Sequence, residues 1–526
     1  MGMYINVGNA GFRSARNGEY VDKSGLIRIV NATLFTKRRF SCVTRSRRFG
    51  KSMAAEMLCA YYDKSCDSRE LFADLEIASD PEFEKRLNKY PVIFLDISDF
   101  VTRFSGDVIV EKMDAELRKD VSAAYPDIPV EADDDLMNYL GRIVASTGQP
   151  FIFFIDEWDS ICREFEPGTK AMDNYVNWLR RLFKGGLSSQ VFAGVYLTGI
   201  LPIKKYNTQS ALNNFVEYSM VEPRSMGRYF GFTKEEVRSL AEKYGVDFDE
   251  LEKWYDGYQI GDEPSMFNPN SVMMAVDIGR CRSFWAATGA FDAVTGYIRM
   301  NYEGLKDDII GMLAGERCKV NPTKFGNDMR DIHSKDDVLT VLIHLGYLSY
   351  NWRNDECYIP NKEVAGEMVN AIEANNWKPV VDALAKSEKL LAATLAGDEE
   401  AVAKGVEVVH DENTSILSYN DENSLACVLS IAYYYARNNY VMHRELATVK
   451  GFADIVFIPR KNVDSPALVI ELKVDKSADA AIDQIRRKEY PAKVADYSGK
   501  MLLVGINYDR ESKQHSCKIE RMAPIK

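Results

Sequence analysis

The stretch that most constrains the fold runs from position 41 to position 52 and reads Ser-Cys-Val-Thr-Arg-Ser-Arg-Arg-Phe-Gly-Lys-Ser. Its apolar start, its basic middle and the apolar pattern that follows predict a strand, a phosphate-binding loop and a helix. A Gly-Lys-Ser at a helix start surrounds a phosphate with backbone N–H groups and an ammonium, and leaves the serine hydroxyl for Mg²⁺. The predicted nucleotide-binding residues of this loop are Arg48, Phe49, Gly50, Lys51, Ser52 and Met53, with Ser52 also a Mg²⁺ ligand.

Two features leave an alternative open for this loop. The usual phosphate-loop pattern has glycine at its first position, where this chain has Arg45. Gly-Lys-Ser also occurs by chance at ordinary helix starts. The choice between a nucleotide site and a plain helix start therefore depends on what the rest of the chain supplies.

Composition limits the class of protein. A length of 526 residues suggests three to four domains at roughly 150 residues each. No apolar run approaches the roughly 18 residues needed to cross a bilayer, and the first residues lack the pattern of a secretory leader, so we expect a cytoplasmic protein with no membrane contact. The nine cysteines form no Cys-x-x-Cys pair, and the net charge of −12 argues against non-specific coating of nucleic acid, although a local basic groove remains compatible with it.

Two later apolar runs end in side chains suited to nucleotide chemistry. The run from Pro150 ends in Asp156 and Glu157, at the edge where parallel strands deliver their carboxyl ends. Asp156 could hold Mg²⁺ and Glu157 could orient the attacking water. The run from Val191 ends in Thr198, whose hydroxyl could sense a terminal phosphate. A strand ending in a solvated acidic turn is the alternative for the paired acids, and the upstream Gly-Lys-Ser favours the catalytic interpretation.

Strands alternating with amphipathic segments predict a three-layer α/β domain over residues 1–230. Arg224 and Arg228 follow it and could reach a phosphate in this chain or in a neighbouring one, which would make the protein a homo-oligomer; for each of them a surface ion pair is the simpler interpretation. A helical lid is expected over 231–300. A mainly helical connector is expected over 301–410, with a helix and small hairpin that fit a winged helix and a plain linker equally well.

The pattern changes to strand-like alternation in the last predicted domain, residues 411–526. Two antiparallel strands around a turn would carry Asp454 on one and Glu471 with Lys473 on the other. Because Glu471 and Lys473 are two residues apart, they share one face of their strand. The two carboxylates could bind Mg²⁺ while the lysine orients water or stabilises the scissile phosphate. An exposed edge-strand ion pair is the alternative, and Glu422 is a further candidate metal ligand upstream.

A helix is predicted directly after these strands. It carries amide and basic side chains, beginning with Gln484 and continuing through Arg486 and Arg487. Such side chains can contact a nucleic-acid backbone beside a metal site. The predicted catalytic residues of the chain are Glu157, Asp454, Glu471, Lys473 and Gln484.

These residues resemble two known families. Asp454, Glu471-Leu-Lys473 and the Gln484 helix resemble the PD-(D/E)XK nuclease superfamily. The loop at 45–52, the acids at 156–157 and Leu197-Thr-Gly199 look like bacterial AAA-ATPase-like proteins that carry such a nuclease domain at the C-terminus. In that family Arg45 is the usual residue, whereas Ser46 stands where proline is common. The resemblance implies an α/β P-loop ATPase joined to a restriction-endonuclease-like α/β domain.

The sequence therefore predicts an enzyme that uses ATP and Mg²⁺ and cuts DNA, with nucleotide state controlling the nuclease. RNA is not excluded as the substrate. The alternative is a nucleotide-switched module that binds DNA or another partner without cutting it, in which case the metal ligands would have no use.

Overall fold

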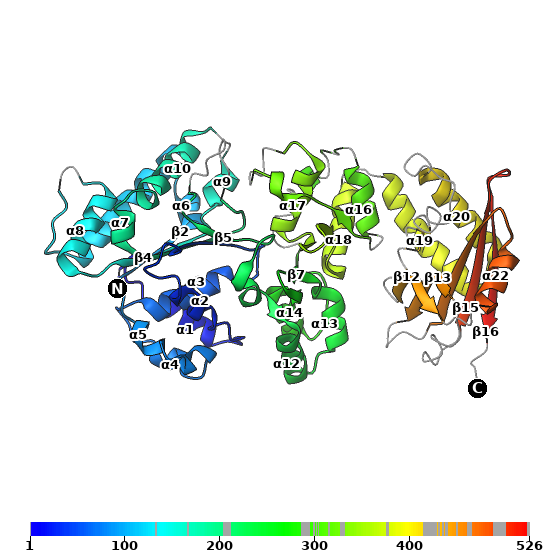
Figure 1. Ribbon diagram of the computed structural model, residues 1–526, viewed down its shortest axis with the longest axis horizontal. Helices are drawn as coiled ribbons and strands as arrows, with labels where there is room; N and C mark the ends of the chain where they lie inside the picture. The colour runs from blue at the N-terminus through cyan, green and yellow to red at the C-terminus, as the bar shows by residue number, and fades with distance from the viewer. Residues whose placement is uncertain are drawn as a thin grey trace. The chain divides into compact units, whose positions relative to one another are not determined.

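Figure 1 shows the protein as a computed structural model. The structure describes residues 2–131, 134–165, 168–203, 212–285, 295–297, 300, 302, 304–313, 316–326, 332–374, 378–413, 429, 432–433, 436, 440–448, 451–459, 465–487 and 501–522. For residues 306–307, 310, 372–374, 378–385, 411–413, 444–448 and 451–454 it describes the backbone alone. The chain separates into two compact units, residues 1–288 with 319–366 and residues 289–318 with 367–526, and each is treated by itself below.

The first unit is built on a five-stranded parallel sheet with strand order β2-β3-β4-β1-β5. The strands are β1 (Phe40–Thr44), β2 (Val92–Asp96), β3 (Phe151–Asp156), β4 (Phe192–Gly199) and β5 (Val216–Tyr218). The three central strands β1, β3 and β4 are buried at every position, as expected for strands covered on both faces. The sequence predicts β1, β3 and β4, the apolar run from Pro91 to Asp96 likewise predicts β2, and β5 is an addition.

Helices cover both faces of this sheet, which makes the unit three-layered (Figure 1). On one face, α2 (Leu26–Asn31) and α3 (Lys51–Tyr62) pack against residues such as Val43 and Phe154. On the other face, α7 (Ile109–Ala124), α8 (Leu136–Thr147) and α10 (Lys170–Phe183) pack against residues such as Phe153 and Leu197. Smaller elements are α1 (Ala10–Arg16), α4 (Arg69–Phe72), η1 (Glu76–Ser79), α5 (Phe83–Arg86), α6 (Ile97–Arg103), η2 (Gly106–Val108), α9 (Ser160–Glu164) and α11 (Ser188–Val191).

A second group of elements in this unit follows η3 (Arg224–Tyr229). Thr233 and Glu236 form a capping box at the start of α12. The helices are α12 (Lys234–Tyr244), α13 (Phe248–Tyr255) and α14 (Pro269–Ile278), beside a small sheet of β6 (Phe232–Thr233), β7 (Tyr258–Ile260) and β8 (Glu263–Phe267). A helix and hairpin follow, α17 (Lys335–Leu345), β10 (Ser349–Asn351) and β11 (Glu356–Tyr358), with β9 (Cys318–Lys319) and η5 (Pro322–Lys324) before them.

The second unit contains a mixed five-stranded sheet with strand order β12-β13-β14-β15-β16. The strands are β12 (Tyr440–Thr448), β13 (Gly451–Pro459), β14 (Ala467–Val474), β15 (Met501–Asp509) and β16 (Gln514–Met522), and only the β14–β15 pair is parallel. The expected antiparallel pair is β13 and β14, whereas β12, β15 and β16 were not foreseen. The helices are α16 (Leu305–Leu313), α19 (Lys378–Ala396), α20 (Glu399–Asn413) and α22 (Ala478–Arg487). Helix α18 (Lys362–Ala374) begins in the first unit and ends in the second.

Alternation along β14 separates two cores in this unit. Leu468, Ile470 and Leu472 pack in a cluster with residues of α19 and α20. Ala467 and Val469 pack in a second cluster with residues of α22, on the opposite face of the sheet. The α22 side is therefore the face on which Glu471 and Lys473 lie. Within the parts of the chain that the structure describes, no helix has the length and apolar character to cross a bilayer.

Candidate functional sites

A cleft of about 700 Å³ opens at the carboxyl edge of the first sheet. This volume lies within the range of small-molecule sites, roughly 300–1,000 Å³. All of the predicted loop residues, Arg48 to Met53, line it together with Asp156 and Glu157. The other lining residues are Glu19, Tyr20, Val21, Lys23, Arg47, Ala54, Met57, Asp96, Ser98, Arg163, Tyr229, Gly231, Phe232, Pro269, Asn270 and Met273.

The loop takes its shape from left-handed backbone at two positions. Gly50 has φ +85° immediately before α3, and a Cβ there would meet only open space, so backbone conformation rather than crowding makes glycine suitable. Arg48 also has a positive φ of 68°. The loop therefore turns directly into the N-terminus of a helix of 12 residues, the arrangement that binds phosphate.

Arg45 anchors the start of the loop in place of the usual glycine. Its side chain is fully buried, and Nη1 donates to the carbonyls of Thr44 and Tyr218, each at 2.7 Å. The guanidinium also lies 5.0 Å from the ring centre of Phe230. Burial lowers the pKa of Arg45 to about 10, so the cation persists at neutral pH. Arg45 thus fastens the loop to β5 and to the chain entering the second group of elements.

Phe49 anchors the other end of the loop. The ring is fully buried and packs edge-on against Tyr258 at 5.1 Å. Tyr258 in turn donates its hydroxyl to the carbonyl of Gly346 at 2.8 Å. Next to Phe49 is Gly231, where a Cβ would stand 3.4 Å from the phenylalanine ring. The aromatic segment around Tyr258 is therefore core packing that holds the phosphate loop.

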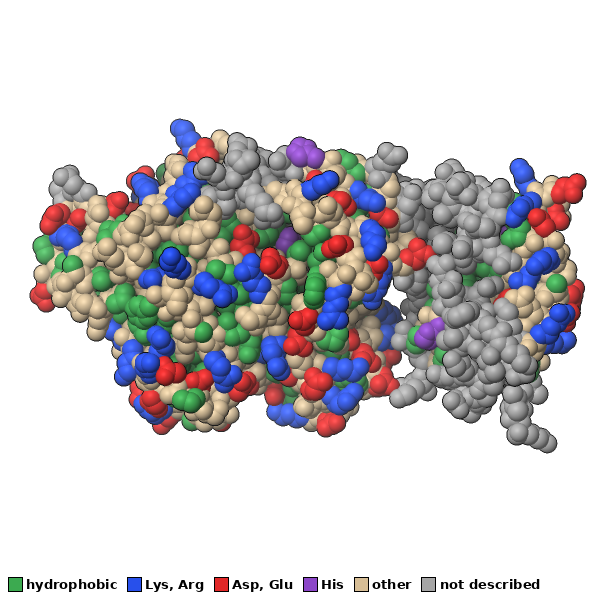
Figure 2. Space-filling view, viewed as in Figure 1, with side chains coloured by type: hydrophobic (Ala, Val, Ile, Leu, Met, Phe, Trp, Pro, Cys, Tyr) green, Lys and Arg blue, Asp and Glu red, His purple; other side chains and the backbone are tan. Residues whose placement is uncertain are grey.

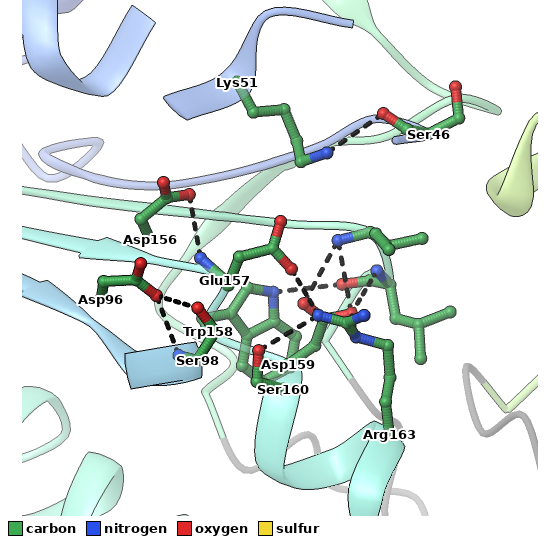
Figure 3. Close-up of polar contacts among 12 residues, drawn as sticks. Ser46, Lys51, Asp96, Ser98, Asp156, Glu157, Trp158, Asp159, Ser160 and Arg163 are labelled. Carbon is green, nitrogen blue, oxygen red and sulfur yellow. Dashed lines mark hydrogen bonds and ion pairs between the residues drawn. The ribbon is translucent and has the colours of Figure 1, made fainter. Parts of the chain in front are cut away.

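Lys51 lies inside the site and is only 5% exposed. Its Nζ donates to the Ser46 carbonyl at 3.0 Å, so the ammonium stays within the loop (Figure 3). Burial lowers the pKa of Lys51, and the carboxylates of Glu157 and Asp156 act in the opposite direction. The lysine is positioned to offer a positive charge to an anion in the cleft.

Asp156 and Ser52 supply a donor pair suited to Mg²⁺. Asp156 is 4% exposed, and burial raises its pKa to about 6, with a hydrogen bond from Ser52 acting against that shift. A serine hydroxyl beside a carboxylate is the oxygen donor set that Mg²⁺ takes in nucleotide sites. The residues present therefore fit the ion that the sequence predicts for this position.

Glu157 is held by a set of contacts that the sequence did not reveal. Glu157 has a backbone φ of +48°, and its backbone N–H donates to Asp156 Oδ1 at 2.9 Å. Its carboxylate forms an ion pair with Arg163 of α9, and Arg163 Nε lies 3.2 Å from Asp159. The four-residue spacing of Asp159 and Arg163 was the available signal, since such pairs meet on one side of a helix.

The remaining predicted residues of the first unit lie away from the cleft lining. Thr198 is fully buried in β4, and its hydroxyl makes no hydrogen bond to a described residue. Arg224 is exposed and forms a surface ion pair with Glu222 at 3.1 Å. Arg228 is also exposed, and its carbonyl accepts a hydrogen bond from Lys23. Their roles in sensing or completing a nucleotide site stay predictions.

In the second unit, Glu471, Lys473 and Gln484 come together. Glu471 is fully buried and Lys473 is 4% exposed, with 3.3 Å between Nζ and Oε1. Gln484 of α22 donates its amide to the same Glu471 oxygen. A buried, hydrogen-bonded ion pair is not the exposed edge-strand pair that was the alternative interpretation.

The two other candidate ligands of this unit are less completely described. Asp454 lies in β13, where Ile455 pairs with Ile470; one more step of that register places position 454 opposite Glu471. Glu422 lies outside the described residues, as do the positions that follow Arg487 in the predicted basic helix. Across the described side chains, no group of three or more His, Cys, Asp or Glu could hold a metal ion.

Two family models match the parts of the chain that contain these two sites. Residues 7–208 match the family model described as predicted AAA-ATPase, and residues 420–517 match the PD-(D/E)XK nuclease superfamily. A curated relative, the "Uncharacterized protein in vnfD 5'region" of Azotobacter chroococcum mcd 1, is 24% identical over 295 residues. That alignment covers 54% of this chain and 54% of the relative, so the chain spans about half the relative's length.

Two solved structures from Aeropyrum pernix overlap more loosely. The ORC2 protein in its ADPNP–ADP complexes is 12% identical with a TM-score of 0.35, covering 69% of this chain and 98% of its own. The ORC1 protein in complex with DNA is 11% identical with a TM-score of 0.25, and the alignment covers 72% of this chain and 99% of the ORC1 chain. Overlap this low carries no information about function. The family matches agree with the geometry of both sites: the chain combines an AAA-ATPase-like domain with a C-terminal domain of the PD-(D/E)XK nuclease superfamily.

Proposed function

We propose that this protein binds and hydrolyses ATP at the first cleft and uses the nucleotide state to control a Mg²⁺-dependent nuclease in its last domain. The observation that carries the proposal is the convergence of Lys51, Ser52, Asp156 and Glu157 on one cleft at the carboxyl edge of a parallel sheet. The predicted division into residues 1–230, 231–300, 301–410 and 411–526 assigns the ATPase to the first part and the nuclease to the last.

Each residue of the first site has a distinct task in this proposal. Lys51 and the N–H groups at the start of α3 bind the phosphates. Ser52 and Asp156 would hold Mg²⁺, which when bound neutralises charge on the phosphate oxygens. Glu157 orients the attacking water.

The second site supports phosphodiester cleavage by the same kind of reasoning. Glu471 and Asp454 would hold the divalent ion, which when bound polarises the scissile phosphate. Lys473 lies beside Glu471 and stabilises negative charge, while Gln484 fixes the Glu471 carboxylate. DNA is the proposed substrate, and RNA remains compatible with this chemistry.

The surface bears on how DNA would bind. Figure 2 shows Lys and Arg side chains interspersed with Asp and Glu over the first unit on the face drawn. With a net charge of −12, a mixed surface of this kind favours contacts to a phosphate backbone at local sites over broad electrostatic attraction. We therefore expect nuclease activity to survive moderate salt concentrations only if the protein contacts the phosphate backbone of DNA at such local sites.

One observation favours a second function. The Glu471 carboxylate is fully buried and already engaged by Lys473 and Gln484, which is compatible with a domain that holds DNA or another partner without cutting it. In that case the nucleotide would switch binding instead of cleavage.

A cleavage assay separates the two functions. Linear, circular and single-stranded DNA are incubated with the wild-type protein and Mg²⁺ or Mn²⁺, with and without ATP, beside Lys51→Ala and Glu471→Gln. We expect cleavage that Glu471→Gln abolishes and that Lys51→Ala makes insensitive to ATP. Absence of product under every condition, with DNA binding retained, would establish the switch instead. A protein that binds no ATP would contradict the proposal at the first site.

A further inference from the structure

We propose that Arg163 is the positioning residue of Glu157: it ties the carboxylate that orients the attacking water to the end of β4. The inference rests on the proposed ATPase function and adds a residue that neither the sequence patterns nor the family matches single out. It follows from a chain of polar contacts that runs from the backbone after β4 through Asp159 and Arg163 to Glu157.

The first link in this chain is a fixed carboxylate. Asp159 is fully buried and accepts the backbone N–H groups of Ile200 at 3.2 Å and Leu201 at 3.0 Å. These two residues directly follow β4, the strand that carries Thr198. A buried carboxylate held by two N–H groups cannot rotate without leaving donors unsatisfied, so its place is set by the sheet.

The second link is the guanidinium of Arg163. Its Nε lies 3.2 Å from Asp159, and Nη2 donates to Ser160 Oγ at 3.1 Å and to the Glu157 carboxylate. Figure 3 shows Arg163 reaching from α9 toward Glu157, with Asp159 and Ser160 beside it. Arg163 is only 19% exposed and is one of the residues lining the cleft. The guanidinium therefore bridges two carboxylates, of which one is fixed by the backbone.

Glu157 itself shows why such an anchor is needed. Its φ of +48° is a conformation that non-glycine residues rarely adopt and that persists where the surroundings enforce it. Its backbone is held by the hydrogen bonds from Glu157 N–H to Asp156 and from Ser160 N–H to the Glu157 carbonyl. The side chain would still rotate, and Arg163 removes that freedom.

Orientation explains these contacts better than a direct action of Arg163 on phosphate. The positive charge of Arg163 is already shared between Glu157 and Asp159, whereas Lys51 offers an ammonium from the phosphate loop. A carboxylate has about four acceptor positions, so one hydrogen bond from arginine leaves others for water. Arg163 thus acts through Glu157.

A double-mutant cycle tests this assignment. Single-turnover ATP hydrolysis and the Kd of a fluorescent ATP analogue are measured for wild type, Arg163→Ala, Glu157→Gln and the double variant. We expect Arg163→Ala to slow hydrolysis by about 10–100-fold while Kd changes less than about 2-fold, because misorientation affects the chemical step. In the Glu157→Gln background the same substitution should have no further effect, since the residue through which it acts is already disabled.

Controls keep the result interpretable. Arg142→Ala also removes an arginine that bridges two carboxylates, Glu131 and Asp134, away from the cleft, and it should leave the rate unchanged. If Arg163→Ala does not fold, Arg163→Lys carries the test: it keeps a charge near Asp159 but cannot span both acids, so a several-fold slower rate is expected.

Three results would overturn the assignment. If Arg163→Ala slowed ATP hydrolysis by the same factor in the wild-type protein and in the Glu157→Gln variant, Arg163 would act on phosphate directly. A wild-type rate in Arg163→Lys or Arg163→Ala, or a faster one, would mean that the ion pair does not orient Glu157 for catalysis. A wild-type protein that neither binds nor hydrolyses ATP would remove the proposed function as well, and the Kd measurement identifies that case separately.

Discussion

The two sites of this protein are both centred on a buried lysine beside acids, yet the lysines are held in different ways. Lys51 is 5% exposed and donates to a backbone carbonyl of its own loop, Ser46, at 3.0 Å. Lys473 is 4% exposed; it donates to the backbone carbonyl of Leu472 at 2.6 Å and also pairs with the carboxylate of Glu471 at 3.3 Å. The first lysine is kept for a ligand by loop geometry, whereas the second is already neutralised by a neighbour on its strand.

The difference lies in what positions each residue. At the nuclease site, strand alternation alone places Glu471 and Lys473 on one face. At the nucleotide site, the loop depends on side chains that reach distant parts of the unit: Arg45 reaches Tyr218, and Phe49 reaches Tyr258. We therefore expect substitutions at the second site to affect local charge balance, and substitutions at the first to affect loop shape.

The largest effect is expected from Lys473→Ala. Removing one partner of a buried ion pair takes away the positive charge beside Glu471, which costs about 3–5 kcal/mol of unfolding free energy. Lys51→Ala should change stability by only about 1 kcal/mol, because it removes a single hydrogen bond to a carbonyl. Chemical denaturation of both variants measures the contrast, and DNA cleavage and ATP hydrolysis should be lost in the respective variants.

The double variant Glu471→Gln with Lys473→Met is the control for this contrast. Both charges are removed together, so most of the stability lost in Lys473→Ala should return while cleavage stays absent. Equal stability of Lys473→Ala and Lys51→Ala would show that the Glu471–Lys473 pair is not buried in solution and would remove the contrast.

A second large effect is expected from Phe49→Ala. Emptying a fully buried phenylalanine site costs about 3 kcal/mol, and a loosened loop should weaken ATP binding by about 10-fold through lost preorganisation. Phe72→Ala is a matched control, because Phe72 is also fully buried in the first unit but does not line the cleft. It should cost similar stability and leave the Kd for ATP unchanged. Equal effects on Kd would show that Phe49 acts only through global stability.

These contrasts also explain which parts of the fold and of the two sites could be predicted from the sequence. Short apolar runs were enough to predict four strands of the first sheet, β1 to β4, and with Gly50-Lys51-Ser52 they placed most of the predicted nucleotide site at one cleft. Period-two alternation was enough to bring Glu471 and Lys473 together. Both signals are local in the chain, so a single sequence contains them.

What the sequence could not show are contacts between distant positions. The ring of Phe49 meets Tyr258 and the guanidinium of Arg45 meets Phe230, about 200 residues later, and no local pattern encodes either contact. The Arg163–Glu157 pair is closer in the chain, but it crosses from a strand end to a short helix and has no fixed period. The sequence also did not predict β5, β12, β15 and β16, which the structure identifies by their pairing with neighbouring strands.

A smaller effect is expected from Asp156→Asn in the absence of nucleotide and Mg²⁺. Burial raises the pKa of Asp156 to about 6 from an ordinary 3.8, so the folded protein binds this proton more tightly than the unfolded chain does. Stability therefore falls as pH rises from about 4 to about 6, and above that range the charged carboxylate costs about 1–3 kcal/mol. Asparagine removes that cost.

Denaturation with EDTA at two pH values measures this effect. Asp156→Asn should be more stable than wild type at pH 8, and the difference should shrink at pH 5. Asp99→Asn, which alters an exposed carboxylate paired with Arg103, is the control and should show little change. A variant less stable than wild type at pH 8 would mean that the carboxylate is stabilised by its surroundings, as Glu471 is at the other site.

The smallest effect is expected from Arg224→Ala. Arg224 is 43% exposed and pairs with Glu222 at the surface, so its removal should change the unfolding free energy by less than about 0.5 kcal/mol. If the residue acts only within its own chain, the ATPase rate per subunit should stay within about 2-fold of wild type and should not depend on protein concentration. A loss of about 1,000-fold with unchanged stability is what an arginine finger supplied by a neighbouring subunit would give. That result would make the nucleotide site one that two subunits share.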